Sequence, residues 1–85
     1  MDRKQFGKLI AALRREQRDE HDHEYTQAKL AEVVGVSEQI IGKIERGEKI
    51  TYEADLLINL AKAFRLSSPE RQEFFLAAVG LEEKD

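Results

Sequence analysis

The chain has 85 residues, 41% of them hydrophobic, and no cysteine. This length predicts one domain, spanning residues 1–85, with one modest core, and the lack of cysteine excludes disulfides, thiolate catalysis and cysteine-based zinc sites. The net charge of −3 argues against nucleic-acid binding by the whole surface. Six basic and two acidic residues nevertheless give residues 1–18 a charge of +4, whereas four acidic residues give residues 19–25 a charge of −4.

The sequence contains no long apolar run. A transmembrane helix or a signal peptide would need one. We therefore expect a cytoplasmic protein with no membrane partner.

The first predicted element is an amphipathic helix. Its apolar face consists of Phe6, Leu9, Ile10 and Leu13, because residues three and four apart lie on the same side of a helix. The basic residues of this segment occupy its other faces.

The segment that follows, residues 18–25, has the sequence RDEHDHEY. It either extends the first helix by a turn or forms an exposed acidic loop, which is tolerated because closure entropy grows slowly with length. His21 and His23 with their acidic neighbours allow a divalent-metal site or a pH sensor to be considered. Two histidines two apart on a helix point to different faces and no third ligand cluster is evident, so a solvated loop without metal is favoured.

Residues 26–47, TQAKLAEVVGVSEQIIGKIERG, form the most informative stretch. Leu30, Ala31 and Val34 have the spacing of one face of a short helix, and small Ala31 suits a close helix crossing. Gly35 can take the positive φ that a tight turn between helices needs, and Ser37 can cap the next helix.

A second short helix follows this turn. Val36, Ile41 and Ile44 supply its core side. Its remaining positions then face outward: Ser37, Glu38, Gln39, Ile40, Gly42 and Lys43, with Arg46 near the end.

A fourth helix is predicted to start at Glu53 or Asp55 and to end near Arg65. Its apolar face consists of Leu56, Leu57, Leu60, Ala61, Ala63 and Phe64.

A fifth helix is predicted over about residues 69–79. The segment Ser67-Ser68-Pro69-Glu70 would cap it, with proline in the first turn, and Gly80 would stop it. The acidic end, Glu82 to Asp85, is interpreted as a tail or as the start of a linker, so the chain is either a whole small protein or the amino-terminal domain of a longer one.

The elements together predict an all-α fold, a compact five-helix bundle with a central helix-turn-helix over residues 26–47. This stretch resembles the Cro-like, phage-repressor (xenobiotic-response-element) helix-turn-helix family, and with the flanking helices the resemblance covers most of the chain. The residues that match the family pattern are Thr26-Gln27, Leu30-Ala31, Gly35-Val36-Ser37, Ile41 and Ile44-Glu45-Arg46-Gly47.

The chain departs from the family at two places. The connection over residues 18–25 is about five residues longer than the usual short link. Gly42 stands where family members often have a phosphate-bonding side chain such as Ser; it costs the helix roughly 1 kcal/mol unless the backbone comes close to DNA there.

The resemblance implies that the second helix of the motif reads double-stranded DNA in the major groove. Gln39 can pair with adenine, Glu38 can accept from a cytosine amine or reject wrong sequences, and Lys43 can reach guanine or phosphate. Ile40 either packs on a thymine methyl or tucks against a neighbouring helix. The predicted base-reading residues are Ser37, Glu38, Gln39, Ile40 and Lys43.

Other positions are predicted to contact phosphates, by resemblance and because they carry hydrogen-bond donors or positive charge. They are Thr26, Gln27, Arg46, Lys49 and Arg14. Glu45 would repel phosphate and is predicted instead to pair with a basic residue of the first helix.

The fifth helix carries two adjacent phenylalanines, which cannot both lie on one narrow face. One of them can be surplus to the core of a monomer. Phe74, Phe75, Val79 and Leu81, with Leu76, are therefore predicted to form a two-fold dimer interface or to dock onto a downstream ligand-sensing or partner domain that this chain lacks; a broad core face around the fourth helix is the alternative.

The functional prediction is a sequence-specific transcription regulator of bacterial or phage origin, acting as a dimeric repressor on a pseudo-palindromic operator. The alternative is a protein-interaction module, such as an antitoxin or adaptor, that keeps the fold but binds DNA weakly. The sequence has no glycine-rich phosphate loop and no converging serine, histidine and acid. Neither an enzyme nor a cofactor is expected.

Overall fold

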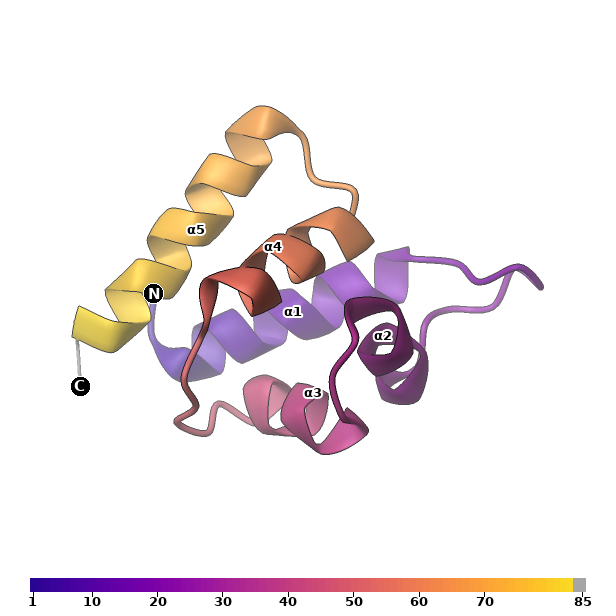
Figure 1. Ribbon diagram of the computed structural model, residues 1–85, viewed down its shortest axis with the longest axis horizontal. Helices are drawn as coiled ribbons and strands as arrows, with labels where there is room; N and C mark the ends of the chain where they lie inside the picture. Colours follow the sequence, from indigo (N-terminus) through magenta and orange to yellow (C-terminus); the bar gives the residue numbers. More distant parts are fainter. Residues whose placement is uncertain (84–85) are drawn as a thin grey trace.

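The computed structural model describes residues 1–83, which form five helices and no strand beyond one isolated bridge between Arg18 and Glu24. The helices are α1 (Arg3–Glu16), α2 (Gln27–Val34), α3 (Glu38–Glu45), α4 (Ala54–Ala63) and α5 (Ser68–Glu83). Figure 1 shows α3 and α5 on opposite sides of α1 and α4. The predicted all-α bundle is confirmed, and Lys84 and Asp85 of the predicted tail lie outside the described residues.

Side chains cap four of the five helices at their first turn, where backbone N–H groups lack partners. Asp2 accepts from the Gln5 N–H at 2.8 Å before α1, and Thr26 and Ser37 cap α2 and α3. Ser67 caps α5 by accepting from the Glu70 N–H at 3.3 Å. The predicted caps of the helix after Ser37 and of the fifth helix are therefore confirmed.

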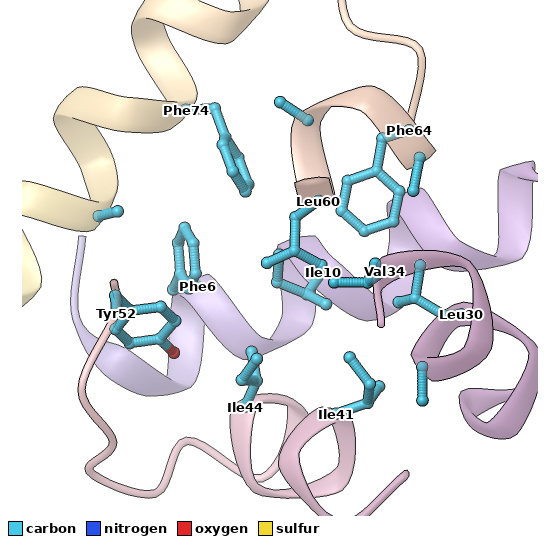
Figure 2. Close-up of a cluster of buried hydrophobic side chains, with 14 of the residues drawn as sticks. Phe6, Ile10, Leu30, Val34, Ile41, Ile44, Tyr52, Leu60, Phe64 and Phe74 are labelled. Atoms are coloured by element: carbon cyan, nitrogen blue, oxygen red, sulfur yellow. The ribbon is translucent and has the colours of Figure 1, made fainter. Parts of the chain in front are cut away.

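One part of the core consists of aromatic rings from α1, α5, the end of α4 and the loop before α4 (Figure 2). The Phe6 ring lies 5.4 Å from the rings of both Tyr52 and Phe74, and Phe64 meets Phe74 edge-on. Burial raises the pKa of Tyr52 to about 12, because a phenolate is disfavoured away from water. The part of the core that surrounds the rings is aliphatic: Ile10, Leu30, Val34, Ile41, Ile44 and Leu60.

Two helices approach each other closely where Gly7 of α1 meets the end of α3. A Cβ atom on Gly7 would collide with the carbonyl oxygen of Ile44 and stand 2.7 Å from that of Glu45. Ala31, the small residue singled out for such a contact, is buried in α2, and Gly7 is a second small residue at a close crossing. Gly7 lies three residues before Ile10 on the buried side of α1, which is the sequence signal that could have identified it.

The predicted end of the fifth helix at Gly80 is wrong, because α5 continues to Glu83. A glycine ends a helix when the chain turns there in the left-handed conformation. Gly80 keeps helical geometry instead, and Leu81 beyond it is buried in the core. Core packing of Leu81 therefore outweighs the local preference of the glycine. None of the helices within residues 1–83 is long and apolar enough to span a membrane.

Candidate nucleic-acid interface

The turn between α2 and α3 has the geometry that the sequence predicts. Gly35 ends α2 in the left-handed conformation, with φ 87°, and its N–H donates to the Ala31 carbonyl at 2.8 Å. Ser37 Oγ accepts from the Ile40 N–H at 3.3 Å and so starts α3. Local sequence thus sets the angle between the two helices.

A buried ion pair holds both helices of the motif to α1. Arg14 donates to Glu45 through Nε at 2.7 Å and through Nη2 at 2.9 Å, and its Nη1 donates to the Tyr25 carbonyl at 2.8 Å. Gln27 Nε2 donates to Glu45 Oε1 at 3.0 Å. The side chains of Arg14 and Glu45 are only 12% and 9% exposed, so the pair fixes α3 relative to α1 and α2.

The electrostatics of this pair agree with its geometry. Burial of the Glu45 carboxyl favours its neutral form, but hydrogen bonds from Arg14 and Gln27 outweigh burial and lower its pKa. The same hydrogen bond raises the pKa of the Arg14 guanidinium. The predicted pairing of Glu45 with a basic residue of the first helix is confirmed.

The structure disfavours the prediction that Arg14 contacts phosphate. All three kinds of guanidinium nitrogen, Nε, Nη1 and Nη2, donate to Glu45 or to the Tyr25 carbonyl. Breaking these bonds to reach DNA would leave a carboxylate unpaired in a mostly buried site, which is costly.

Apart from Ile40, the outward face of α3 is polar. Glu38, Gln39 and Lys43 are exposed, and Ser37 is exposed while it caps the helix. A side chain that reads a base edge must be accessible in this way, so these four residues remain candidate base readers.

Ile40 differs from the other predicted base readers. It is half-buried and lines a groove of about 320 Å³ with five residues of α3, α4 and the adjoining loops: Val36, Ile50, Thr51, Glu53 and Leu56. Of the two interpretations of Ile40, the structure favours packing against neighbouring elements, since apolar neighbours already cover much of its side chain.

Gly42, included in the outward set on sequence grounds, is buried. A Cβ atom there would lie 3.0 Å from Arg46 Nη1 and 3.6 Å from Gln27 Oε1. These two side chains cover the helix at the position where the family often carries a side chain of its own.

The comparison with known proteins agrees with this geometry. A family model described as helix-turn-helix matches residues 15–71, which is the region from the end of α1 into the first turn of α5. The chain belongs to the Cro-like helix-turn-helix family. This is a family of DNA-binding regulators of transcription. A search of curated protein sequences found no match to this chain.

Among the predicted phosphate contacts of this helix-turn-helix protein, Thr26, Arg46 and Lys49 are exposed. Arg46 Nε forms an exposed ion pair with Glu48 Oε2 at 2.6 Å. Gln27 is half-buried because its amide donates to Glu45. Sequence analysis did not single out Glu48, although its position two residues after Arg46 was visible.

The long connection between α1 and α2 is an ordered, exposed loop, which decides between the two alternatives left open by the sequence. The first helix ends at Glu16, and the loop folds back so that the Asp19 N–H donates to the His23 carbonyl at 2.9 Å. The Asp19 carboxylate accepts from the N–H groups of His21 and His23. Figure 1 shows this loop projecting from the molecule beyond α1 and α2.

The hydrogen bonds in this loop lower the pKa of Asp19, first through the His23 N–H and then through that of His21. The two imidazole rings lie 6.3 Å apart. Across residues 1–83, no group of three His, Cys, Asp or Glu side chains is placed to hold a metal ion.

The structure divides the predicted dimer residues of α5 into two sets. Phe74 and Leu81 are buried, at 3% and 2% exposure, so neither can be offered to a partner, and their assignment to a dimer surface is wrong. Both face the core of the chain's own bundle. Leu76 and Val79 are 65% and 51% exposed, and Phe75 is half-buried beside Phe74. The outer face of α5 therefore consists of Phe75, Leu76 and Val79.

Proposed function

We propose that the chain is a sequence-specific repressor that binds a pseudo-palindromic operator as a homodimer. The observation that carries the proposal is the fixed presentation of α3. Exposed Gln39 and Lys43 lie on a helix that a buried Arg14–Glu45 pair joins to α1. A recognition helix held in one orientation can place its side chains against base edges, and a dimer bound over the operator would exclude polymerase.

Within this proposal, Gln39 reads adenine through paired hydrogen bonds, and Lys43 reaches guanine or a phosphate. Glu38 accepts from a cytosine amine or repels wrong sequences. Ser37 is less available to read a base than the other three residues, because its hydroxyl already accepts from the Ile40 N–H. Thr26, Gln27, Arg46 and Lys49 supply contacts to the DNA backbone.

The homodimer would form through the outer face of α5. Apolar residues lie on both sides of this helix, with Phe74 and Ala78 buried and Leu76 and Val79 exposed. A helix that is apolar all round is usually covered all round, and a two-fold axis would pair this surface with its own copy. Half-sites would then lie about one helical turn, roughly 34 Å, apart.

Selection of bound duplexes from a random DNA library tests the proposal. The wild-type chain should enrich a two-fold-symmetric site, and Gln39→Ala should relax the preference at one base pair of each half-site. Glu16→Ala changes an exposed residue at the end of α1, outside both proposed surfaces, and should leave the selected site unchanged. Failure of the wild-type chain to enrich any motif would contradict sequence-specific binding.

Sedimentation at rising protein concentration tests the dimer. Leu76→Lys should yield a monomer with unchanged helix content, because charge on a shared apolar face opposes association. A wild-type chain that stays monomeric with its selected duplex would contradict the α5 interface.

A second function, a protein-interaction module, is favoured by the exposed α5 face and by the acidic loop over residues 18–25. The two functions differ in their response to salt. Binding through several phosphates weakens steeply with ionic strength, whereas burial of Leu76 and Val79 against a protein responds little.

A further inference from the structure

Gly42 and Arg46 lie one helical turn apart on α3, and the side chain of Arg46 turns back over the glycine. A Cβ built on Gly42 would be 3.0 Å from Arg46 Nη1 and 3.7 Å from its Cζ. Contacts of 3.0 to 3.4 Å are tighter than most Cβ contacts, so the guanidinium would have to move by a few tenths of an ångström for alanine and farther for a branched side chain. Because Gly42 has no side chain, the Arg46 guanidinium can lie directly against α3 at this position, which we call the seat.

Two neighbours define the orientation of the guanidinium in this seat. Glu48 Oε2 accepts from Arg46 Nε at 2.6 Å. This bond uses the Nε edge of the planar guanidinium. Gln27 Oε1 lies 3.6 Å from the same Cβ position, and the Gln27 amide is held in that orientation because its Nε2 donates to Glu45. Arg46 Nη1 and Gln27 Oε1 thus both lie close to Gly42, and the Arg46 side chain is exposed.

An arginine placed in this way suits a phosphate. Its guanidinium carries five N–H donors, and Glu48 engages one of them, so the terminal nitrogens can make a bidentate contact. The Gln27 carbonyl oxygen close to Gly42 carries no net charge, so it does not repel the DNA backbone.

We propose that Gly42 is a positioning residue, which seats the Arg46 guanidinium against α3 beside Gln27 so that Arg46 binds one backbone phosphate of double-stranded DNA. The proposal rests on the proposed function, because it names a backbone contact of the same interface. It also explains why a helix-weakening residue occupies the middle of α3. A side chain at this position would displace the Arg46 guanidinium, and glycine has none.

The test measures binding to a random-sequence duplex pool by fluorescence anisotropy over a range of salt concentrations. Phosphate contacts carry no sequence information, so the pool reports on Arg46 whether or not the chain selects a motif. Arg46→Gln should lower the slope of log K against log salt by about 0.9, the value for one phosphate, and should weaken binding roughly tenfold at low salt. Gly42→Val should cause the same loss, and Gly42→Ala a smaller one.

The double variant separates positioning from a general structural effect. If Gly42 acts through Arg46, Gly42→Val combined with Arg46→Gln should bind no more weakly than Arg46→Gln alone. Ala12→Val is the control for adding a β-branched side chain to a helix, because Ala12 is exposed on α1, and it should keep the wild-type slope. Circular dichroism of each variant verifies folding; should Gly42→Val not fold, Gly42→Ala with and without Arg46→Gln gives the same comparison.

Each contrary result has one meaning. A wild-type slope in Gly42→Val, or additive losses in the double variant, would overturn the positioning role while DNA binding stands. A wild-type slope in Arg46→Gln would overturn the phosphate contact. No binding of the pool by the wild-type chain would overturn this inference together with the proposed function, whereas pool binding without an enriched motif would remove only the sequence specificity.

Discussion

Two contacts of α1 differ in how they are made. Against α3, the backbone of α1 at Gly7 touches carbonyl oxygens, and Arg14 donates two hydrogen bonds to Glu45. Against α5, the contact consists of side chains, with the Phe6 and Phe74 rings 5.4 Å apart. Beside these rings lies a groove of about 310 Å³ lined by Leu9, Leu13 and other residues. A single added or removed atom at the α1–α3 contact would therefore disturb it, because backbone atoms and an ion pair meet there. The side chains of the α1–α5 contact can adjust by repacking.

The largest expected effect is on the buried ion pair. Glu45→Ala should lower the free energy of unfolding by about 3 kcal/mol, because Arg14 would remain mostly buried without its carboxylate. Urea denaturation measures this change. The control is Glu48→Ala, which breaks a pair of similar length, 2.6 Å, whose side chains are 62% and 46% exposed; it should cost less than about 0.5 kcal/mol. Equal losses would show that burial does not distinguish the two pairs.

Glu45 should also make the stability of the fold depend on pH. The folded-state pKa of Glu45 lies below its ordinary value, so its ionised form contributes stability above the unfolded-state pKa of about 4.3. That contribution is lost as the pH falls through the lower folded-state pKa. Stability measured from pH 7 down to acid should fall less in Glu45→Gln than in the wild-type chain, and parallel curves would contradict the assignment.

The next effect is steric. Gly7→Ala should destabilise the fold by about 2 kcal/mol, because its Cβ would collide with the backbone of α3 and force the two helices apart. Thermal unfolding measures the loss. Ala12→Gly serves as a reference on the exposed side of α1, since it should show only the helix-propensity cost of glycine, about 1 kcal/mol. A neutral Gly7→Ala would mean that the α1–α3 contact adjusts as readily as the α5 contact.

The motif could be predicted from sequence because local chemistry specifies it. Thr26, Gly35 and Ser37 each act on their own turn of the chain, and the apolar spacing around them identifies the buried faces. The pairing of Glu45 with a basic residue of the first helix followed from charge, because a carboxylate in this motif needs a cation. The caps, the turn and the apolar faces involve neighbours in sequence or a helix period, whereas Glu45 and Arg14 are 31 residues apart and their pairing could be predicted from charge alone.

Other features depended on long-range contacts that spacing does not encode. Gly7 was visible on the inner side of α1, but only the folded chain shows which backbone approaches it. Arg14 was assigned to phosphate because exposure was assumed for a basic residue, whereas Glu45 and Tyr25 engage it. The fifth helix does not end at Gly80 because the next residue, Leu81, is buried in the core.

A smaller effect is expected at the junction between α4 and α5. Arg65 has φ 55°, a left-handed conformation that a residue with a Cβ adopts at a cost. Arg65→Gly should therefore raise the free energy of unfolding by about 1 kcal/mol, measured by urea denaturation. Arg65→Ala removes the charge but keeps the Cβ, so it should give no such gain. A gain in both variants would assign the effect to charge rather than to the backbone.

The smallest effect is expected in α5 itself and completes the comparison with Gly7. Gly80 lies within the helix, and a Cβ there would meet no atom within 4 Å. Gly80→Ala should thus stabilise the chain by about 0.5 kcal/mol, somewhat below the full propensity difference because the site is near a helix end that frays. The same glycine-to-alanine change then has opposite signs in α1 and α5. Destabilisation by Gly80→Ala would indicate that a partner surface, such as the proposed second copy, already approaches α5 at this position, and the loss should then disappear at protein concentrations too low for association.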